Sequence, residues 1–255
     1  MDFYPKTLVD LIARGVLDPA ARTLVIAAGP YDHQSLLEAG FSNVTISNLQ
    51  SHGDAEYPPY EWSHLDGEKL ELEDESYAQV IEHMGLHHCS SPHKALLEMY
   101  RVASRAVVVF ENRDSLSMRL AVKFGLTSEF ELPAVRQNSL TSGGMRNGPI
   151  PNYVYRWTER EVEKTVASAD PGHDVPIRYF YNARFPAGRA KGLRGLKRLT
   201  LEGVRVPYAV YSRLFRRQAN VFGFCIEKSA RKPKAWMNEA ASALNAEWAH
   251  SARLP

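Results

Sequence analysis

The chain has few of the features that would place it in a specialised class of protein. Its 255 residues include only two cysteines, Cys89 and Cys225, which lie far apart and fit no metal or redox spacing. We therefore expect neither a disulfide framework nor a structural zinc site, and we expect a reducing, cytoplasmic location. No run of residues approaches the ~20 apolar residues that a membrane helix requires.

A signal for export and a strong net charge are also missing. The first residues, MDFYPKTLVDLIARG, carry an acid at Asp2 and neither a basic start nor an apolar stretch, which argues against a secretory signal. The formal net charge of +2 at pH 7 is too small to predict nucleic-acid binding. Apolar residues make up 44% of the chain and charged residues 24%, as in ordinary globular proteins, so composition leaves the fold class open.

Strand and helix patterns alternate through the first half of the chain. A leading helix is expected to end near Gly15, ahead of the first strand. Because alternating strands and helices predict a parallel sheet, we expect an α/β fold. The expected strands lie at 23–28, 43–49, 77–84 and 106–110, and the helices between them at 32–39 and 91–105.

The second half departs from this rhythm. Residues 113–157 include SGGMRNGPIPN, whose glycines and prolines disfavour regular structure, so we expect a cap inserted over the sheet. A helix is expected to begin at Thr158, which forms a capping box with Glu161. Two further strands are expected at 175–185 and 219–228, with a basic insertion between them at 186–218.

These elements predict one decorated domain over residues 1–228. Residues 229–255 are expected to form a tail with a helix. Apolar side chains would lie near one face of that helix. They are Trp236, Met237, Leu244 and Trp248.

Polar residues gather directly after the expected strands. The segment AAGPYD follows the strand at 23–28, MGLHHCSSPH the strand at 77–84 and ENRD the strand at 106–110. A further expected strand, the third in chain order, precedes HLDGEKL, which makes the strands at 77–84 and 106–110 the fourth and fifth. In an open parallel sheet, ligands bind outside the carboxyl ends of the strands. These segments are therefore the first candidates for a functional site.

The arrangement resembles the class I S-adenosylmethionine-dependent methyltransferases, particularly the small-molecule branch often labelled type 11. The resembling segments are TLVIAAGPYD and HLDGEKLELEDESYAQVIEHMGLHHCSSPHKALLEMYRVASRAVVVF, in the front half of the chain. In the second, an Asp, an acidic spacer, an aromatic-led strand, a double His, a Pro, a Leu-Glu-x-x-Arg-Val helix and an apolar strand occur in family order. The resemblance implies a Rossmann-like seven-stranded sheet with helices on both faces, S-adenosylmethionine as cofactor, and a small-molecule acceptor.

The resemblance also implies roles for particular residues. Asp66 would bind the adenine amino group, and Gly67 and Glu68 would line the adenine pocket. The turn at Gly29 would approach the amino acid end of the cofactor.

Two positions depart from the family pattern. Where the family shows a three-glycine turn, this chain has Ala27, Gly29 and Tyr31. Where an acid normally holds the ribose hydroxyls, the chain has Asn48, whose amide forms weaker hydrogen bonds than a carboxylate. These departures motivate the alternative hypothesis of a binding or scaffold protein that kept the fold and lost turnover. They also disfavour a nicotinamide dehydrogenase, which needs a glycine-rich phosphate turn and a ribose-binding acid.

His87 and His88 are the candidates for a catalytic base, since histidine titrates closest to neutral pH. The alternative is that they pack and hydrogen-bond at the start of a helix. Together with His83, Cys89 and His93 they form a cluster that matches no standard tetrahedral zinc spacing. Neighbouring histidines seldom converge on one ion without a carboxylate from elsewhere, so we expect no metal.

The candidates for acceptor binding follow the fifth strand and close the expected cap. They are Glu111, Asn112, Tyr153, Tyr155 and Arg156. Aromatic, amide and guanidinium groups suit a polar ring or an acid, so the preferred acceptor is a hydroxyl or carboxyl on a polar metabolite such as a sugar or glycan precursor. The alternatives are that the first two cap a loop and that the last three form an aromatic hinge.

A basic segment spans residues 184–217, with ten Lys or Arg and one acid, Glu202. Its default interpretation is a solvated amphipathic face. The alternatives are contact with an anionic membrane, an anionic substrate or a partner. No nucleic-acid partner is expected, and the sequence leaves the oligomeric state open.

Overall fold

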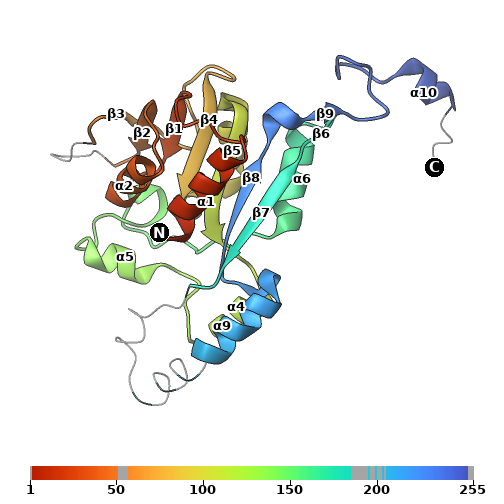
Figure 1. Ribbon diagram of the computed structural model, residues 1–255. Helices are drawn as coiled ribbons and strands as arrows, with labels where there is room; N and C mark the ends of the chain where they lie inside the picture. Colours follow the sequence, from red (N-terminus) through yellow and green to blue (C-terminus); the bar gives the residue numbers. More distant parts are fainter. Residues whose placement is uncertain are drawn as a thin grey trace.

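A central sheet with helices on both faces organises the molecule (Figure 1). The computed structural model describes residues 2–50, 57–184, 195, 199, 203 and 205–251. Within these ranges the main sheet has seven strands in the order β3-β2-β1-β4-β5-β8-β7. They are β1 (Thr23–Ile26), β2 (Val44–Asn48), β3 (Glu61–His64), β4 (Tyr77–His83), β5 (Ala103–Asn112), β7 (Ile177–Asn182) and β8 (Val221–Ile226).

The strand directions bring several loops to one edge of the sheet. Strands β3, β2, β1, β4 and β5 pair in parallel, whereas β8 is antiparallel to both β5 and β7. The carboxyl ends of the parallel strands therefore share an edge, where a ligand site is expected. This topology confirms the expected α/β class with a mostly parallel seven-stranded sheet.

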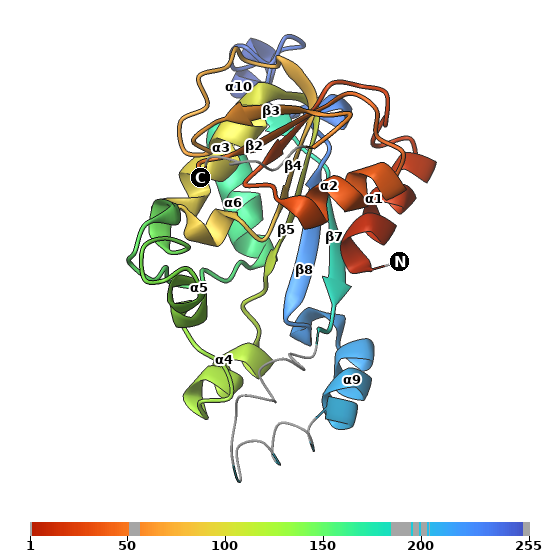
Figure 2. The same ribbon diagram turned by 90° about the vertical axis from the view of Figure 1, so that its left-hand side faces the viewer.

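Apolar side chains alternate between the two faces of β5. Val107 and Val109 belong to the core beneath α3 and α6, while Val108 and Phe110 belong to the core beneath α1 and α2. Figure 2 shows the two helix pairs on opposite sides of the sheet. A strand buried on both faces reads as a continuous apolar run, which explains the AVVVF sequence. The helices are α1 (Phe3–Ala13), α2 (Pro30–Glu38), α3 (Pro92–Val102) and α6 (Glu159–Ala169).

The expected cap, residues 113–157, contains more regular structure than its composition indicates. Besides the 3₁₀ turn η2 (Met145–Asn147), it holds the helices α4 (Leu116–Lys123) and α5 (Leu132–Gln137). Helix α4 is capped at its N-terminus by Ser115, whose side chain accepts the backbone N–H of Met118. The interpretation of the cap as an irregular stretch is therefore correct only for its glycine-rich part.

The region after the cap follows the sequence pattern closely. Thr158 caps α6, and the Glu161 carboxylate accepts the backbone N–H of Thr158 at 2.8 Å, which confirms the capping box. Much of the expected basic insertion, at 186–194, 196–198, 200–202 and 204, lies outside the described residues. Its final part forms α9 (Arg205–Leu214) and the 3₁₀ turn η3 (Arg216–Gln218).

The tail differs from its prediction. Its helix, α10, covers only Ala246–Ser251, so Trp236, Met237 and Leu244 precede it. The Asn238 side chain accepts the backbone N–H of Ser242, and such local hydrogen bonds compete with helix formation. The other short elements are η4 (Lys228–Ala230) and the strands β6 (His173–Asp174) and β9 (Lys232–Pro233), which pair with each other. Among the described helices, none combines the length and apolarity needed to cross a bilayer.

Candidate active site

The turn after β1 approaches the turn after β4 closely. Ala27, at the position of the family's first glycine, adopts a left-handed conformation with φ of 54°. Gly85, which precedes the 3₁₀ turn η1 (Leu86–His88), leaves room for it, because a Cβ on Gly85 would collide with the Cβ of Ala27. The missing side chain at position 85 therefore compensates for the extra methyl group at position 27.

A cavity of about 310 Å³ lies at the carboxyl ends of β1, β2 and β4, beneath part of the cap. Four of the predicted cofactor residues line it, and they are Ala27, Asn48, Gly67 and Glu68. Gly29 and Asp66 are not among its lining residues. The cavity is at the lower end of the usual ligand range of roughly 300–1,000 Å³.

The two predicted cofactor residues that do not line the cavity are engaged within the protein. Gly29 caps α2, and its backbone N–H donates to the Asp32 carboxylate at 2.9 Å. The Asp66 carboxylate accepts the backbone N–H of Glu68 at 2.9 Å. Asn48 donates its amide N–H to the Ala28 carbonyl at 3.0 Å, which fixes its orientation at the cavity wall.

Arg146, in the cap, reaches both acids that the resemblance assigns to the adenine pocket. Its guanidinium nitrogens lie 2.6 Å from Asp66 Oδ2 and 2.9 Å from Glu68 Oε2. Glu68 also accepts the backbone N–H groups of Ser90 and Ser91. The buried Glu68 carboxylate is thus fully engaged, whereas Asp66 is held from the cap side by one arginine.

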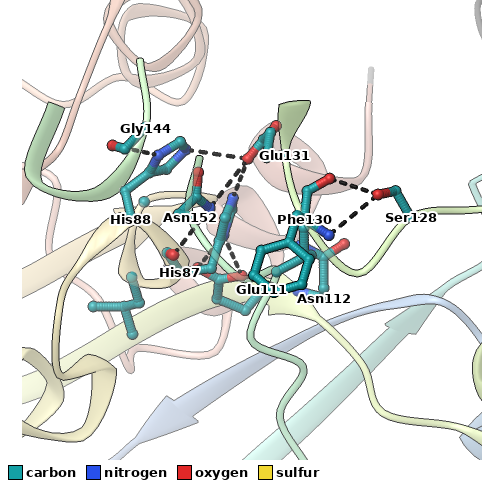
Figure 3. Close-up of polar contacts among 12 residues, drawn as sticks. His87, His88, Glu111, Asn112, Ser128, Phe130, Glu131, Gly144 and Asn152 are labelled. Atoms are coloured by element: carbon teal, nitrogen blue, oxygen red, sulfur yellow. Dashed lines mark hydrogen bonds and ion pairs between the residues drawn. The ribbon is translucent and has the colours of Figure 1, made fainter. Parts of the chain in front are cut away.

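His87 lies between two carboxylates that come from different parts of the fold (Figure 3). Its Nδ1 is 2.9 Å from both oxygens of Glu111, at the end of β5, and its Nε2 is 3.2 Å from Glu131, in the cap. Burial favours the neutral ring, but Glu111 and Glu131 outweigh it and raise the pKa of His87 to about 10. His87 is therefore an imidazolium at neutral pH.

His88 has the opposite protonation. Burial and the charge of His87 lower the pKa of His88, so its ring is neutral at pH 7. Its Nε2 lies 3.5 Å from Glu131, and its Nδ1 lies 3.4 Å from the Gly144 carbonyl. The hydrogen bond from His87 lowers the pKa of Glu131 to about 2, so Glu131 is ionised. Asn152 holds this arrangement by donating to the backbone carbonyl of His87 at 3.0 Å.

A second cavity, of about 820 Å³, lies on the other side of the histidines, between α4 and α9. Met84 and His88 line both cavities, so these two side chains form the boundary between them. His87 and Glu131 also face the second cavity. Most of its wall is apolar or aromatic, and includes Leu116, Leu120, Ala121, Phe124, Leu126, Val154, Tyr208, Tyr211 and Val221.

The structure divides the residues predicted to bind the acceptor. Asn112 and Arg156 line the 820 Å³ cavity, while Glu111 lies beneath His87, fully buried. Tyr153 and Tyr155 line a third, more polar cavity of about 350 Å³, which Arg156 also borders. The hydroxyl of Tyr155 donates to Glu161 at 2.8 Å, which ties this segment to the start of α6.

Two residues at the site were missed by the reasoning from sequence: Glu131 and Arg146. Both belong to the cap, and their partners lie far away in the chain. Arg146 carried a weak signal, as the single charge within the SGGMRNG stretch. Glu131 carried none, because no local spacing links it to His87. Asn152 stands beside Tyr153 in the stretch whose composition suits ligand binding, and the structure places its side chain against His87 and Glu131.

Comparisons with known proteins agree with this geometry. Residues 33–110 match a family model described as a methyltransferase domain. The chain is similar to the structure of a Bacillus halodurans protein assigned to the methyltransferases, with a TM-score of 0.54 and 14% identity, over 88% of this chain and 99% of that one. It is also similar to an S-adenosylmethionine-dependent methyltransferase from Mesorhizobium loti, with a TM-score of 0.50 and 10% identity, over 88% and 99% of the two chains. No curated protein matches the chain.

At these identities the structural likeness concerns the fold, which is the Rossmann-like methyltransferase fold. The family model covers the segment from α2 to β5, where the sequence carries its most specific resemblance. Together they confirm the resemblance to the class I S-adenosylmethionine-dependent methyltransferases.

Proposed function

We propose that the protein transfers a methyl group from S-adenosylmethionine to an oxygen of a small acceptor with a largely apolar body. The observation that carries the proposal is the position of His88, a neutral histidine on the boundary between two cavities at the carboxyl edge of the sheet. A base at such a boundary faces a donor on one side and an acceptor on the other.

The residues around the 310 Å³ cavity fit the cofactor. Its wall combines apolar side chains, such as Ile26 and Leu65, with the amides of Asn48 and Gln50 and the carboxylate of Glu68. Ala27, Asn48 and Gly67 would hold S-adenosylmethionine, which supplies an electrophilic methyl group on its sulfonium centre when bound. Glu68, whose carboxylate is already bound by Arg146 and two backbone N–H groups, would shape the wall of the same cavity. Ala27 and Gly85 both line this cavity, and their two turns approach closely because Gly85 has no side chain.

The histidine and carboxylate groups supply proton transfer and orientation. Methyl transfer is an in-line displacement, so the acceptor must first be aligned, and a hydroxyl must lose its proton as it attacks. His88 takes that proton on the ring nitrogen that faces Glu131, whose negative charge stabilises the imidazolium formed. The imidazolium of His87, oriented by the Glu111 carboxyl group, keeps Glu131 in place through the contact at 3.2 Å.

The wall of the 820 Å³ cavity supports an acceptor different from the sugar favoured by the sequence. Leu120, Phe124 and Tyr211 belong to a wall that is mostly apolar or aromatic, and His87, His88 and Glu131 contribute polar groups to the same wall. A phenol or a hydroxylated hydrophobic molecule matches this distribution, with its body against α4 and α9 and its oxygen at His88.

The experiment begins with calorimetry, using S-adenosylhomocysteine and no acceptor. Acceptor panels of phenols, hydroxylated hydrophobic compounds and monosaccharides are then compared by release of S-adenosylhomocysteine. We expect turnover with the first two classes and a loss of about 10²-fold or more in His88→Ala, the range for a general base. Arg136→Ala, an exposed change on α5, is the matched control.

Faster methylation of monosaccharides would overturn the acceptor class while leaving the activity in place. Binding of S-adenosylhomocysteine without turnover on any panel would favour the alternative of a binding or scaffold protein with the methyltransferase fold. That alternative keeps its support from Ala27 and Asn48, which replace a glycine and an acid of the family pattern.

We also propose that α9 contacts an anionic membrane surface, which would give the cavity access to hydrophobic acceptors. Val206, Val210 and Leu214 are more than half exposed on this helix, and Arg213 and Arg216 lie at its end and in the turn after it. Exposed apolar and cationic side chains on one helix favour an anionic interface. A cytoplasmic location and a role without nucleic acid stay predictions.

A further inference from the structure

His87, His88 and Glu131 form a group whose ligand atoms converge at the wall of the 820 Å³ cavity. One nitrogen of each histidine and one carboxylate oxygen lie within 4.8 Å of one another. The Nε2 atoms of His87 and His88 lie 3.2 and 3.5 Å from Glu131 Oε2. We propose that these three side chains bind a divalent transition-metal ion of the zinc class.

The distances agree with coordination by a small ion. Zinc binds imidazole nitrogen and carboxylate oxygen at about 2.0–2.2 Å, so neighbouring ligand atoms of a tetrahedral site are roughly 3.3 Å apart. Both measured separations from Glu131 are close to that value. Two imidazoles and one carboxylate also form a known catalytic zinc set, with the fourth position open to water or substrate.

The surroundings of His87 match those of a metal-binding histidine. Metal ligands of this type usually pass their other ring N–H to a carboxylate, which orients the ring. The Nδ1 of His87 lies 2.9 Å from both oxygens of the fully buried Glu111. Glu131 is oriented as well. Its backbone N–H donates to the backbone carbonyl of Asn152 at 3.0 Å, and its carboxylate accepts the side-chain N–H of Asn152 at 3.4 Å.

The Asn152 side chain gives an independent indication that the cluster of His87, His88 and Glu131 lacks a bound ion or water. Its side chain is 2% exposed, and its Oδ1 has no hydrogen-bond partner among the described residues. A buried amide oxygen without a partner costs free energy, unless a water or an ion satisfies it. The nitrogen of the same amide donates to the Glu131 carboxylate at 3.4 Å, so the unpartnered oxygen belongs to a side chain in direct contact with the cluster.

The open position of such a site would face the acceptor cavity, because His87, His88 and Glu131 all line it. A bound ion would replace the proton on His87 Nε2, which would leave to solvent, while Nδ1–H would stay with Glu111. The ion would also lower the pKa of an acceptor hydroxyl, whose proton would leave to solvent because His88 would hold the ion. The inference thus deepens the proposed function at the same site, but metal binding itself depends on neither cofactor nor acceptor. The proposed site also explains why the spacing of residues along the chain predicts no metal, since the required carboxylate, Glu131, comes from the cap.

The test titrates the full chain, freed of metal by a chelator, with Zn²⁺ by calorimetry and with Co²⁺ by visible absorption, without cofactor or acceptor. We expect one ion per chain and Co²⁺ bands typical of low coordination number. His88→Ala and Glu131→Gln should each weaken Zn²⁺ binding more than about tenfold, and Glu111→Gln should weaken it by roughly 10–100-fold, as outer carboxylates do. His250→Ala, on the exposed α10, should change nothing.

Circular dichroism and thermal melting of each variant show whether its fold is kept. Unchanged Zn²⁺ affinity in folded His88→Ala and Glu131→Gln overturns the metal site. Metal binding with these losses, but without methyl transfer, upholds the site and rejects the proposed function. Methyl transfer that persists in a chelator, from a protein without Zn²⁺ affinity, upholds the function and rejects the site.

Discussion

The Nδ1 atom of His87 lies 2.9 Å from both carboxylate oxygens of Glu111, and the Glu111 side chain is completely buried. Glu111 is the penultimate residue of β5, while His87 belongs to the turn after β4, so the contact ties two neighbouring strand ends together. Glu111 also accepts the backbone N–H of His87, which fixes the ring and its main chain at once. Removing either partner leaves the other buried without its charge partner.

We expect Glu111→Gln to lower the free energy of unfolding by roughly 1–3 kcal/mol, since a buried charge-assisted hydrogen bond becomes a neutral one. The pKa of His87 should fall at the same time, because Glu111 is the strongest of the groups that raise it. Urea denaturation gives the first quantity, and nuclear magnetic resonance titration of the imidazole gives the second. Unchanged values for both would mean that the contact contributes nothing in solution.

Stability should fall in acid through Glu159, at the start of α6. Burial raises the pKa of Glu159, but hydrogen bonds from Arg113 and Tyr181 outweigh burial and lower the pKa below its ordinary value of 4.5. Because the pKa of Glu159 is lower in the folded state than in the unfolded state, ionised Glu159 stabilises the fold fully above pH 4.5. This stabilisation is lost as the pH falls through the folded-state pKa. In Glu159→Gln the free energy of unfolding should depend less steeply on pH below 4.5. An equally steep acid limb in that variant would exclude Glu159 as its source.

Asp66 and Arg146 should have opposite effects on cofactor affinity. Asp66→Ala should weaken S-adenosylhomocysteine binding by roughly 1–3 kcal/mol, the cost of losing a buried hydrogen-bond partner. Arg146→Ala should strengthen it, because the Asp66 carboxylate now pairs with Arg146 at 2.6 Å and would become free for the adenine amino group. Calorimetry measures the affinity of both variants for S-adenosylhomocysteine, with Arg136→Ala as the control. Weaker binding in Arg146→Ala would show that the arginine helps to hold the ligand.

Cys89 offers a chemical report on the cofactor cavity. It lines that cavity, whereas Cys225, the other cysteine of the chain, is fully buried. Burial and nearby carboxylates raise the pKa of Cys89, so its thiol is protonated at neutral pH and should react slowly with maleimides. S-adenosylhomocysteine should slow the reaction further, as mass spectrometry of the labelled chain would show. Labelling at an unchanged rate with saturating ligand would place the ligand elsewhere.

The α9 surface should bind anionic vesicles at low ionic strength. Lys and Arg near an anionic bilayer contribute about 1 kcal/mol each, and salt weakens the effect. Replacing Arg213 and Arg216 by Gln should reduce co-sedimentation with vesicles that contain phosphatidylserine at low ionic strength. Val206→Ser and Leu214→Ser should reduce vesicle binding both at low ionic strength and at higher salt. Equal sedimentation with neutral and anionic vesicles would contradict the proposed contact.

The sequence by itself determined the elements whose signals are local. Apolar runs such as AVVVF predict buried strands because successive side chains face opposite sides of a sheet, and both faces are covered here. Thr158 and Glu161 predict the start of α6 because a capping box satisfies backbone N–H groups within one turn. The polar segments after the strands were also recognisable, because each directly follows a local apolar run. They place His87 and His88 at the carboxyl edge of the sheet.

Only the tertiary structure decided which charges meet at that edge. Glu131 and Asn152 reach His87 through the fold of the cap, and Arg146 reaches Asp66 in the same way. Such contacts depend on loop geometry over long sequence separations, which neither periodicity nor spacing encodes. The protonation of the two histidines follows from these contacts: adjacent in sequence, they differ because His87 lies between two carboxylates and His88 lies beside the charge that results.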